Sequence, residues 1–255
     1  MTERRQPLVR NTDKEIAFLE GFGLKVRLLD PIGAAILDAN LAEDVNVDSQ
    51  VIACIERLMA EQGFVVFKSD KQLEVKDFLR VSCWWGGREL HSTHSVHPAT
   101  PEGNPHVFRL SNDPNQGIMG VGPQWHNDGS FITETFSHAG YHMVRPAEKG
   151  GGTLFAHQAR AFEALGSEKK EYWSRLSSVN ASTGVVHPLV HQHPLLGRNA
   201  VWLHLGMTGA VIEKIAGEDA FRLLNEDQLI ELCHQYNDLL NFGLTAGYSV
   251  KYEYD

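Results

Sequence analysis

The apolar runs of this sequence are short, and their brevity most limits the fold that the chain can adopt. Runs of about four to eight residues, bounded by Gly, Pro, Asn or His, predict β-strands. The clearest are 64–67, 137–144, 153–157, 185–191, 200–205 and 247–254, and 107–110 is a further short candidate. The runs 185–191 and 200–205 are expected to pair as a hairpin with its turn at 196–199. Helical periodicity is confined to a few segments, which are 47–62, 75–84, 159–165 and 225–240. Many short strands with few helices predict a mainly β fold with helical cover (α+β) around a double-sheet jelly-roll core, as one domain over residues 1–255.

The segment Gln124–Phe131 holds a His and a carboxylate two residues apart, between a Trp and a Phe. On a strand, residues i and i+2 point to the same side, so His126 and Asp128 can aim a ring nitrogen and a carboxylate oxygen at one point. A nitrogen and a carboxylate oxygen are two thirds of the facial triad that holds non-haem Fe(II). Alone, the His-x-Asp pattern is more often an ordinary polar strand end than a metal site.

Two further blocks follow this motif in order. The first is Gly-Gly-Gly-Thr-Leu-Phe-Ala over 150–156, and the second is His-Pro-Leu-Val-His-Gln-His-Pro-Leu-Leu-Gly-Arg over 187–198. Together the three blocks resemble the taurine dioxygenase (TauD/TfdA) family of Fe(II)- and 2-oxoglutarate-dependent oxygenases, whose fold is a jelly roll. The resemblance implies that His126 and Asp128 bind Fe(II), that the Thr153 hydroxyl bonds a carboxylate of the cosubstrate 2-oxoglutarate, and that O2 is consumed.

The third protein ligand has no clear match in the sequence. In the family, a distal His and an Arg for 2-oxoglutarate lie in a later strand pair, and no such segment precedes Asp255. We expect that the sequence stops before the C-terminal strands of the domain. The alternatives within the chain are His204, which follows Trp202 on a predicted strand, and His234, which lies on a predicted amphipathic helix.

Several basic and polar side chains precede the metal motif and are candidates for substrate binding. They are His91, His94, His97, Arg109 and Asn112. In an otherwise acidic chain, this group favours a small substrate that carries a carboxylate. The competing interpretation is a solvated loop whose histidines share no target. His187 and His193 each precede a proline and are predicted to be structural.

The resemblance implies hydroxylation of an unactivated C–H bond as the default reaction. Oxidative ring closure or desaturation of an amino-acid-derived precursor, as in kainoid synthases, is the alternative outcome. Asp128 argues against halogenation, because halogenating relatives carry a small residue in place of this carboxylate. Since a fold does not determine a function, a non-catalytic jelly-roll binding protein is the alternative of another class.

Composition sets the remaining expectations. The formal net charge is −9 and no Lys/Arg run is long enough to follow a phosphate backbone, which argues against a nucleic-acid partner. The N-terminus leads to no signal-peptide core and no run is long and apolar enough to span a membrane, so we expect a cytoplasmic protein. Three cysteines without paired spacing predict neither a disulfide framework nor a zinc site. A homo-oligomer is left open.

Overall fold

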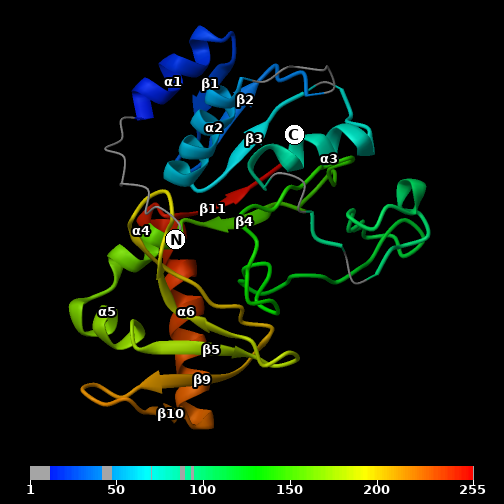
Figure 1. Ribbon diagram of the computed structural model, residues 1–255. Coiled ribbons are helices and arrows are strands. Elements are labelled where there is room, and N and C mark those ends of the chain that lie inside the picture. Colours follow the sequence, from blue (N-terminus) through cyan, green and yellow to red (C-terminus); the bar gives the residue numbers. More distant parts are fainter. Residues whose placement is uncertain (1–11, 42–47, 70, 87–89, 93–94, 255) are drawn as a thin grey trace.

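A computed structural model describes residues 12–41, 48–69, 71–86, 90–92 and 95–254. Its N-terminal part is a small three-stranded sheet covered by helices (Figure 1). The elements in chain order are α1 (Thr12–Gly21), β1 (Lys25–Leu28), β2 (Ala34–Leu37), α2 (Ser49–Gln62), β3 (Val65–Phe67) and α3 (Val75–Gly86). Strands β1 and β2 are antiparallel, whereas β2 and β3 are parallel because α2 forms the crossover between them.

The predicted helix–strand pair at 47–67 is confirmed, and its ends have local causes. The side chain of Asp48 accepts a hydrogen bond from the amide of Gln50 at 2.7 Å and so caps the start of α2. Gly63, with φ at 92°, ends the helix and donates its amide to the carbonyl of Met59. The inner face of α2 packs against α1 and the sheet through Leu19, Ala34, Ile36, Val51, Cys54, Ile55 and Leu58.

The larger part of the molecule is a four-stranded antiparallel sheet with a long helix against it (Figure 1). The elements are α4 (Gln158–Ala164), α5 (Ser167–Trp173), β5 (Leu176–Asn180), β6 (Val186–Pro188), β9 (Thr208–Lys214), β10 (Phe221–Leu223) and α6 (Glu226–Ala246), with the strands ordered β10-β9-β5-β6. Alternate residues of β5 are buried, as expected for a strand with one face on a core. That core joins helices and sheet through Trp173, Leu176, Val211, Leu232, Tyr236 and Leu240.

Helix α6 matches its predicted start closely. Asn225 accepts a hydrogen bond from the amide of Gln228, and the Gln228 side chain accepts one from the amide of Asn225, which completes a capping box. The helix runs on to Ala246, beyond the predicted 240, and Gly247 ends it in the left-handed conformation.

Two further strand pairs lie outside these sheets. β4 (Thr153–Ala156) pairs with β11 (Ser249–Tyr252), and β7 (Val190–Gln192) pairs with β8 (Asn199–Val201). The predicted hairpin is therefore confirmed next to its turn, whereas residues 186–188 of its first predicted strand form β6 and pair with β5. Phe64 stacks on Phe155 of β4 with ring centroids 4.4 Å apart and meets Tyr252 edge-on. The β4–β11 pair therefore lies between the N-terminal sheet and the larger part, as Figure 1 shows.

The prediction of a strand at 137–144 is wrong. The described residues 95–152 form turns and irregular backbone, with one short 3-10 turn (Pro101–Gly103) and a single bridge between Leu110 and Ile118. The predicted strand at 107–110 is thus reduced to that bridge. Tyr141, Met143 and Val144 are exposed rather than paired, because a strand forms only where a neighbour takes up its backbone hydrogen bonds.

Among the described residues, no helix combines the length and the apolar character needed to cross a lipid bilayer.

Candidate metal and cosubstrate site

His126 and Asp128 point to the same side, although they do not lie on a paired strand as predicted. His126 Nε2 is 3.8 Å from Asp128 Oδ1. The neighbours between and beside them point the other way. Trp125 Nε1 donates to Asn241 of α6 at 3.0 Å, and the side-chain oxygen of Asn127 accepts from Gln158 of α4 at 2.8 Å. Trp125 and Asn127 are thus anchored to helices α6 and α4, and this leaves His126 and Asp128 to share the opposite side, as they would on a paired strand.

The ring of His126 is held in the tautomer that a metal needs. Its Nδ1 lies 2.7 Å from the backbone carbonyl of Gln124. A carbonyl can only accept a hydrogen bond, so Nδ1 carries a proton, and Nε2, which faces Asp128, is the nitrogen that a metal would take in the neutral ring. A Cβ at Gly122, where φ is +69°, would lie 2.7 Å from the ring, so only glycine admits the imidazole in this position.

The carboxylate of Asp128 has two different environments. Oδ1 faces His126, while Oδ2 accepts a hydrogen bond from the hydroxyl of Tyr141 at 3.3 Å. The backbone carbonyl of Asp128 also accepts a hydrogen bond from the hydroxyl of Thr135 at 3.1 Å. Although Tyr141 as a residue is 61% exposed, burial at its hydroxyl, followed by the charge of Asp128, raises its pKa to about 12, so this hydroxyl is a donor at neutral pH.

The hydroxyl of Thr153 contacts a second tyrosine, Tyr254. It begins β4 opposite Tyr252 of β11, and its hydroxyl lies 2.8 Å from the hydroxyl of Tyr254. Tyr254 in turn contributes to the raised pKa of Tyr141, after burial and Asp128. Tyr141 is thus hydrogen-bonded to the Asp128 carboxylate and lies within electrostatic range of Tyr254. Neither tyrosine belongs to a motif, and no sequence signal pointed to them.

His204 lies beside His126. Their ring centroids are 5.2 Å apart, and the amide of Leu205 donates to the carbonyl of Trp125 at 3.2 Å, which holds the two segments together. Burial, and then the proximity of His126, lower the pKa of His204, so its ring is neutral at neutral pH. Its Nδ1 is buried and has no hydrogen-bond partner among the described residues.

These residues fit the metal that the sequence suggests only in part. His126 Nε2 and Asp128 Oδ1 are the nitrogen and carboxylate donors of a facial triad. Within the described part of the chain, no three side chains of His, Cys, Asp or Glu converge as a metal site. His204 is adjacent without completing such a group, and His234, which is exposed on α6, belongs to no such group of described residues either.

The predicted substrate residues differ in their positions. The ring of His91 lies 4.8 Å from that of Phe136 and 5.6 Å from that of Phe131, next to the metal motif. His97 Nε2 instead meets the carbonyl of Pro114 at 3.0 Å, and Arg109 Nε donates to the carbonyl of Gln116 at 2.5 Å. Both contacts are made within the segment 97–116, so these two side chains bond to their own loop. Asn112 is exposed, and His94 lies outside the described residues.

The structural roles predicted for His187 and His193 fit their contacts. His187 donates from Nε2 to the carbonyl of Ile132 at 2.9 Å and packs on Trp202, with ring centroids 4.5 Å apart. His193 accepts from the amides of Leu195 and Leu196 and shapes the β7–β8 turn.

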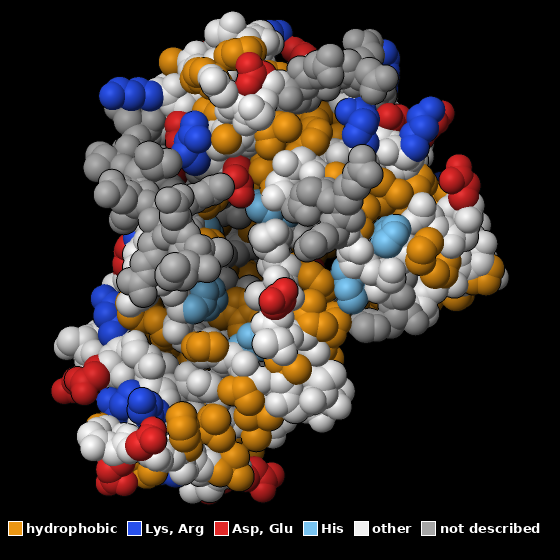
Figure 2. Space-filling model, viewed as in Figure 1, with side chains coloured by type: hydrophobic (Ala, Val, Ile, Leu, Met, Phe, Trp, Pro, Cys, Tyr) orange, Lys and Arg blue, Asp and Glu red, His pale blue; other side chains and the backbone are white. Residues whose placement is uncertain are grey.

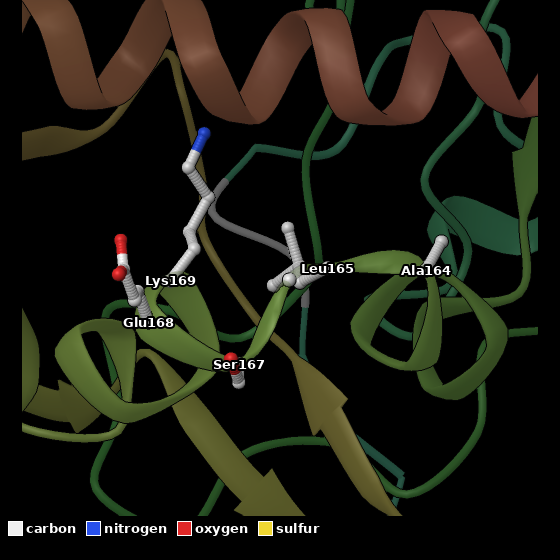
Figure 3. A pocket seen from close by; sticks show the side chains of 6 residues that line it. Ala164, Leu165, Ser167, Glu168 and Lys169 are labelled. Atoms are coloured by element: carbon white, nitrogen blue, oxygen red, sulfur yellow. The ribbon is translucent and has the colours of Figure 1, made fainter.

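Figure 2 shows His side chains across the middle of one face of the molecule, where few Lys or Arg side chains lie. A separate hollow at the turn between α4 and α5 contains none of the predicted site residues (Figure 3). It is lined by Ala164, Leu165, Gly166, Ser167, Glu168 and Lys169.

Several solved structures share the fold of this chain. A taurine dioxygenase from Burkholderia xenovorans superimposes with a TM-score of 0.62 at 17% identity, over 91% of this chain and 78% of its own. AAD-2 in complex with Mn(II) and N-oxalylglycine gives 0.64 at 14% identity, over 91% of this chain and 86% of its own. The likeness confirms the predicted fold class, a jelly roll with mixed helices and sheets.

The family is shown by the sequence. Residues 25–241 match the model of the taurine catabolism dioxygenase TauD, TfdA family, and the chain belongs to that family. An alpha-ketoglutarate-dependent sulfonate dioxygenase of Saccharomyces cerevisiae is 24% identical over 79% of this chain and 54% of its own length. A relative from Schizosaccharomyces pombe is 23% identical over 60% of this chain and 44% of its own. The chain therefore spans about half the length of the curated relatives it matches.

Proposed function

We propose that this protein is an Fe(II)- and 2-oxoglutarate-dependent oxygenase that acts on a small anionic substrate. The observation that carries the proposal is the convergence of His126 Nε2 and Asp128 Oδ1, with the tautomer of His126 fixed by Gln124. These atoms would hold the metal. The likeness to a structure with bound Mn(II) and N-oxalylglycine, which carries two carboxylates as 2-oxoglutarate does, supports the same use of the fold.

Each remaining part of the site has a task in this reaction. The hydroxyl of Thr153, which contacts the hydroxyl of Tyr254 in this structure, would donate to a carboxylate of 2-oxoglutarate. The bound metal supplies oxidative decarboxylation of 2-oxoglutarate by O2 coupled to attack on a C–H bond. The balanced result is a hydroxylated substrate, succinate and CO2. The protein orients the substrate so that one C–H bond reacts.

The substrate class rests on charge and on the relatives. Similar proteins are named for a sulfonate and for taurine, which are anionic or zwitterionic small molecules. His91 is the predicted substrate residue that packs next to the metal motif. A charge-assisted hydrogen bond from the His91 ring to a sulfonate or carboxylate would fix the orientation of the substrate.

The test is succinate release from 2-oxoglutarate with Fe(II) and O2 across sulfonates, carboxylates, and neutral and cationic compounds of similar size. We expect stimulation by one or more anionic compounds and a product heavier by one oxygen. A product lighter by two hydrogens would indicate desaturation or ring closure. Stimulation by neutral or cationic compounds alone would refute the substrate class. Binding of anions without succinate release would favour a binding protein over an enzyme.

A further inference from the structure

We propose that Tyr141 is a positioning residue that keeps Asp128 a one-oxygen ligand of the metal. The inference rests on the proposed function, because it takes His126 and Asp128 as metal ligands. The two carboxylate oxygens of Asp128 have different partners. Oδ2 accepts a hydrogen bond from the Tyr141 hydroxyl at 3.3 Å, and Oδ1 faces Nε2 of His126 at 3.8 Å.

The direction of the Tyr141 side chain is determined by its neighbours. Gly140 lies against α3, because a Cβ at that position would meet the ring of Phe78 at 3.4 Å and the hydroxyl of Ser82 at 3.5 Å. The ring of His142 also packs on Phe78, with centroids 5.7 Å apart. The residues on both sides of Tyr141 thus rest on α3, and the tyrosine extends away from this helix toward Asp128.

This hydrogen bond matters because the number of open metal positions is limited. A facial triad with three single-atom ligands leaves three positions on a six-coordinate ion. 2-Oxoglutarate needs two of these and O2 needs one. If Asp128 turned to bind through both oxygens, one of the three would be lost. A hydroxyl donor on Oδ2 opposes that rotation and also fixes the angle at which Oδ1 approaches the metal.

The experiment uses Co(II) as a spectroscopic probe of the metal site. Apo protein is titrated with Co(II), and its d–d absorption reports both affinity and coordination number. Tyr141→Phe keeps the ring and removes the hydroxyl, and the exposure of this residue makes the change compatible with folding. Tyr172→Phe, on α5, is the matched control. Thermal unfolding of all variants verifies that each is folded.

We expect Tyr141→Phe to bind Co(II) about tenfold more weakly, in the range seen when a hydrogen bond to a metal ligand is removed. Its d–d band should also become weaker, because Oδ2 is free to add a ligand and the coordination number rises. Tyr172→Phe should match the wild type in both respects. A Tyr141→Phe protein with wild-type affinity and band intensity overturns the inference and leaves the proposed function standing, provided that His126→Ala loses Co(II). Equal Co(II) binding by wild type and His126→Ala overturns both.

Discussion

The stability of this protein should depend on pH through His157, which follows strand β4 and is hydrogen-bonded to the end of helix α2. His157 is 4% exposed, its Nε2 donates to the carbonyl of Glu61 at the end of α2 at 3.1 Å, and its amide donates to Tyr248 at 2.8 Å. Burial, followed by the positive charges of Arg160 and Arg198, lowers its pKa from 6.5 to about 4. The folded protein therefore holds this ring neutral.

The sign follows from proton linkage. Above pH 6.5 the ring is neutral in both the folded and the unfolded chain, and its contribution to stability is complete. As the pH falls from 6.5 toward 4, the unfolded chain binds a proton that the folded protein does not, so stability is lost. With these two pKa values the loss is about 2 kcal/mol by pH 5 and about 3 kcal/mol below pH 4, to order of magnitude.

The assay is urea unfolding of wild type and His157→Leu at pH 7.5 and pH 5.0, followed by tryptophan fluorescence. At pH 7.5 the variant should be less stable by about 1–3 kcal/mol, because it leaves the Glu61 carbonyl unpaired. At pH 5.0 that difference should shrink by about 2 kcal/mol, since only the wild type loses the His157 contribution. Other titrating groups are common to both proteins and cancel. A difference that stays the same at both pH values would refute the assigned protonation state.

Two further predictions concern the site. Thr153→Val removes the hydroxyl that we assign to 2-oxoglutarate binding. Since a hydrogen bond to a charged group contributes about 1.5–3 kcal/mol, the apparent affinity for 2-oxoglutarate should fall about tenfold or more while metal affinity is retained. An unchanged affinity for 2-oxoglutarate would show that Thr153 only packs. His204→Ala should weaken metal binding far less than His126→Ala, because the described side chains do not bring three ligands together; an equal loss, measured by Co(II) titration, would identify His204 as the third ligand.

Elements with strong local signals could be predicted from the sequence. The periodicity of 47–62 and 225–240, each bounded by a capping residue and a glycine, gave helices at nearly the observed positions. The hairpin at β7–β8 followed from short apolar runs around a turn. Strands β1, β2, β5 and β9 were not predicted. Ala34–Leu37 is short and uniformly apolar, so it shows no alternation, and the buried face of Leu176–Asn180 includes the polar residues Ser178 and Asn180.

The candidate site was also predicted only in part. Spacing predicted that His126 and Asp128 share a side, but the cause is the anchoring of Trp125 and Asn127 on α6 and α4, which no local pattern reveals. The segment 137–144 looked like a strand by composition, yet it is unpaired and carries Tyr141 to Asp128. Arg109 and His97 suggested an anion site by charge alone, whereas their contacts lie within their own loop.

The central claim is that His126 and Asp128 hold the metal, and Mn(II) binding followed by electron paramagnetic resonance tests it most directly. His234→Ala, on α6, is the matched control for loss of an imidazole. The account predicts one site in the wild type and in His234→Ala, with affinity reduced more than about a hundredfold in His126→Ala and in Asp128→Ala. Wild-type Mn(II) affinity in both His126→Ala and Asp128→Ala would contradict it.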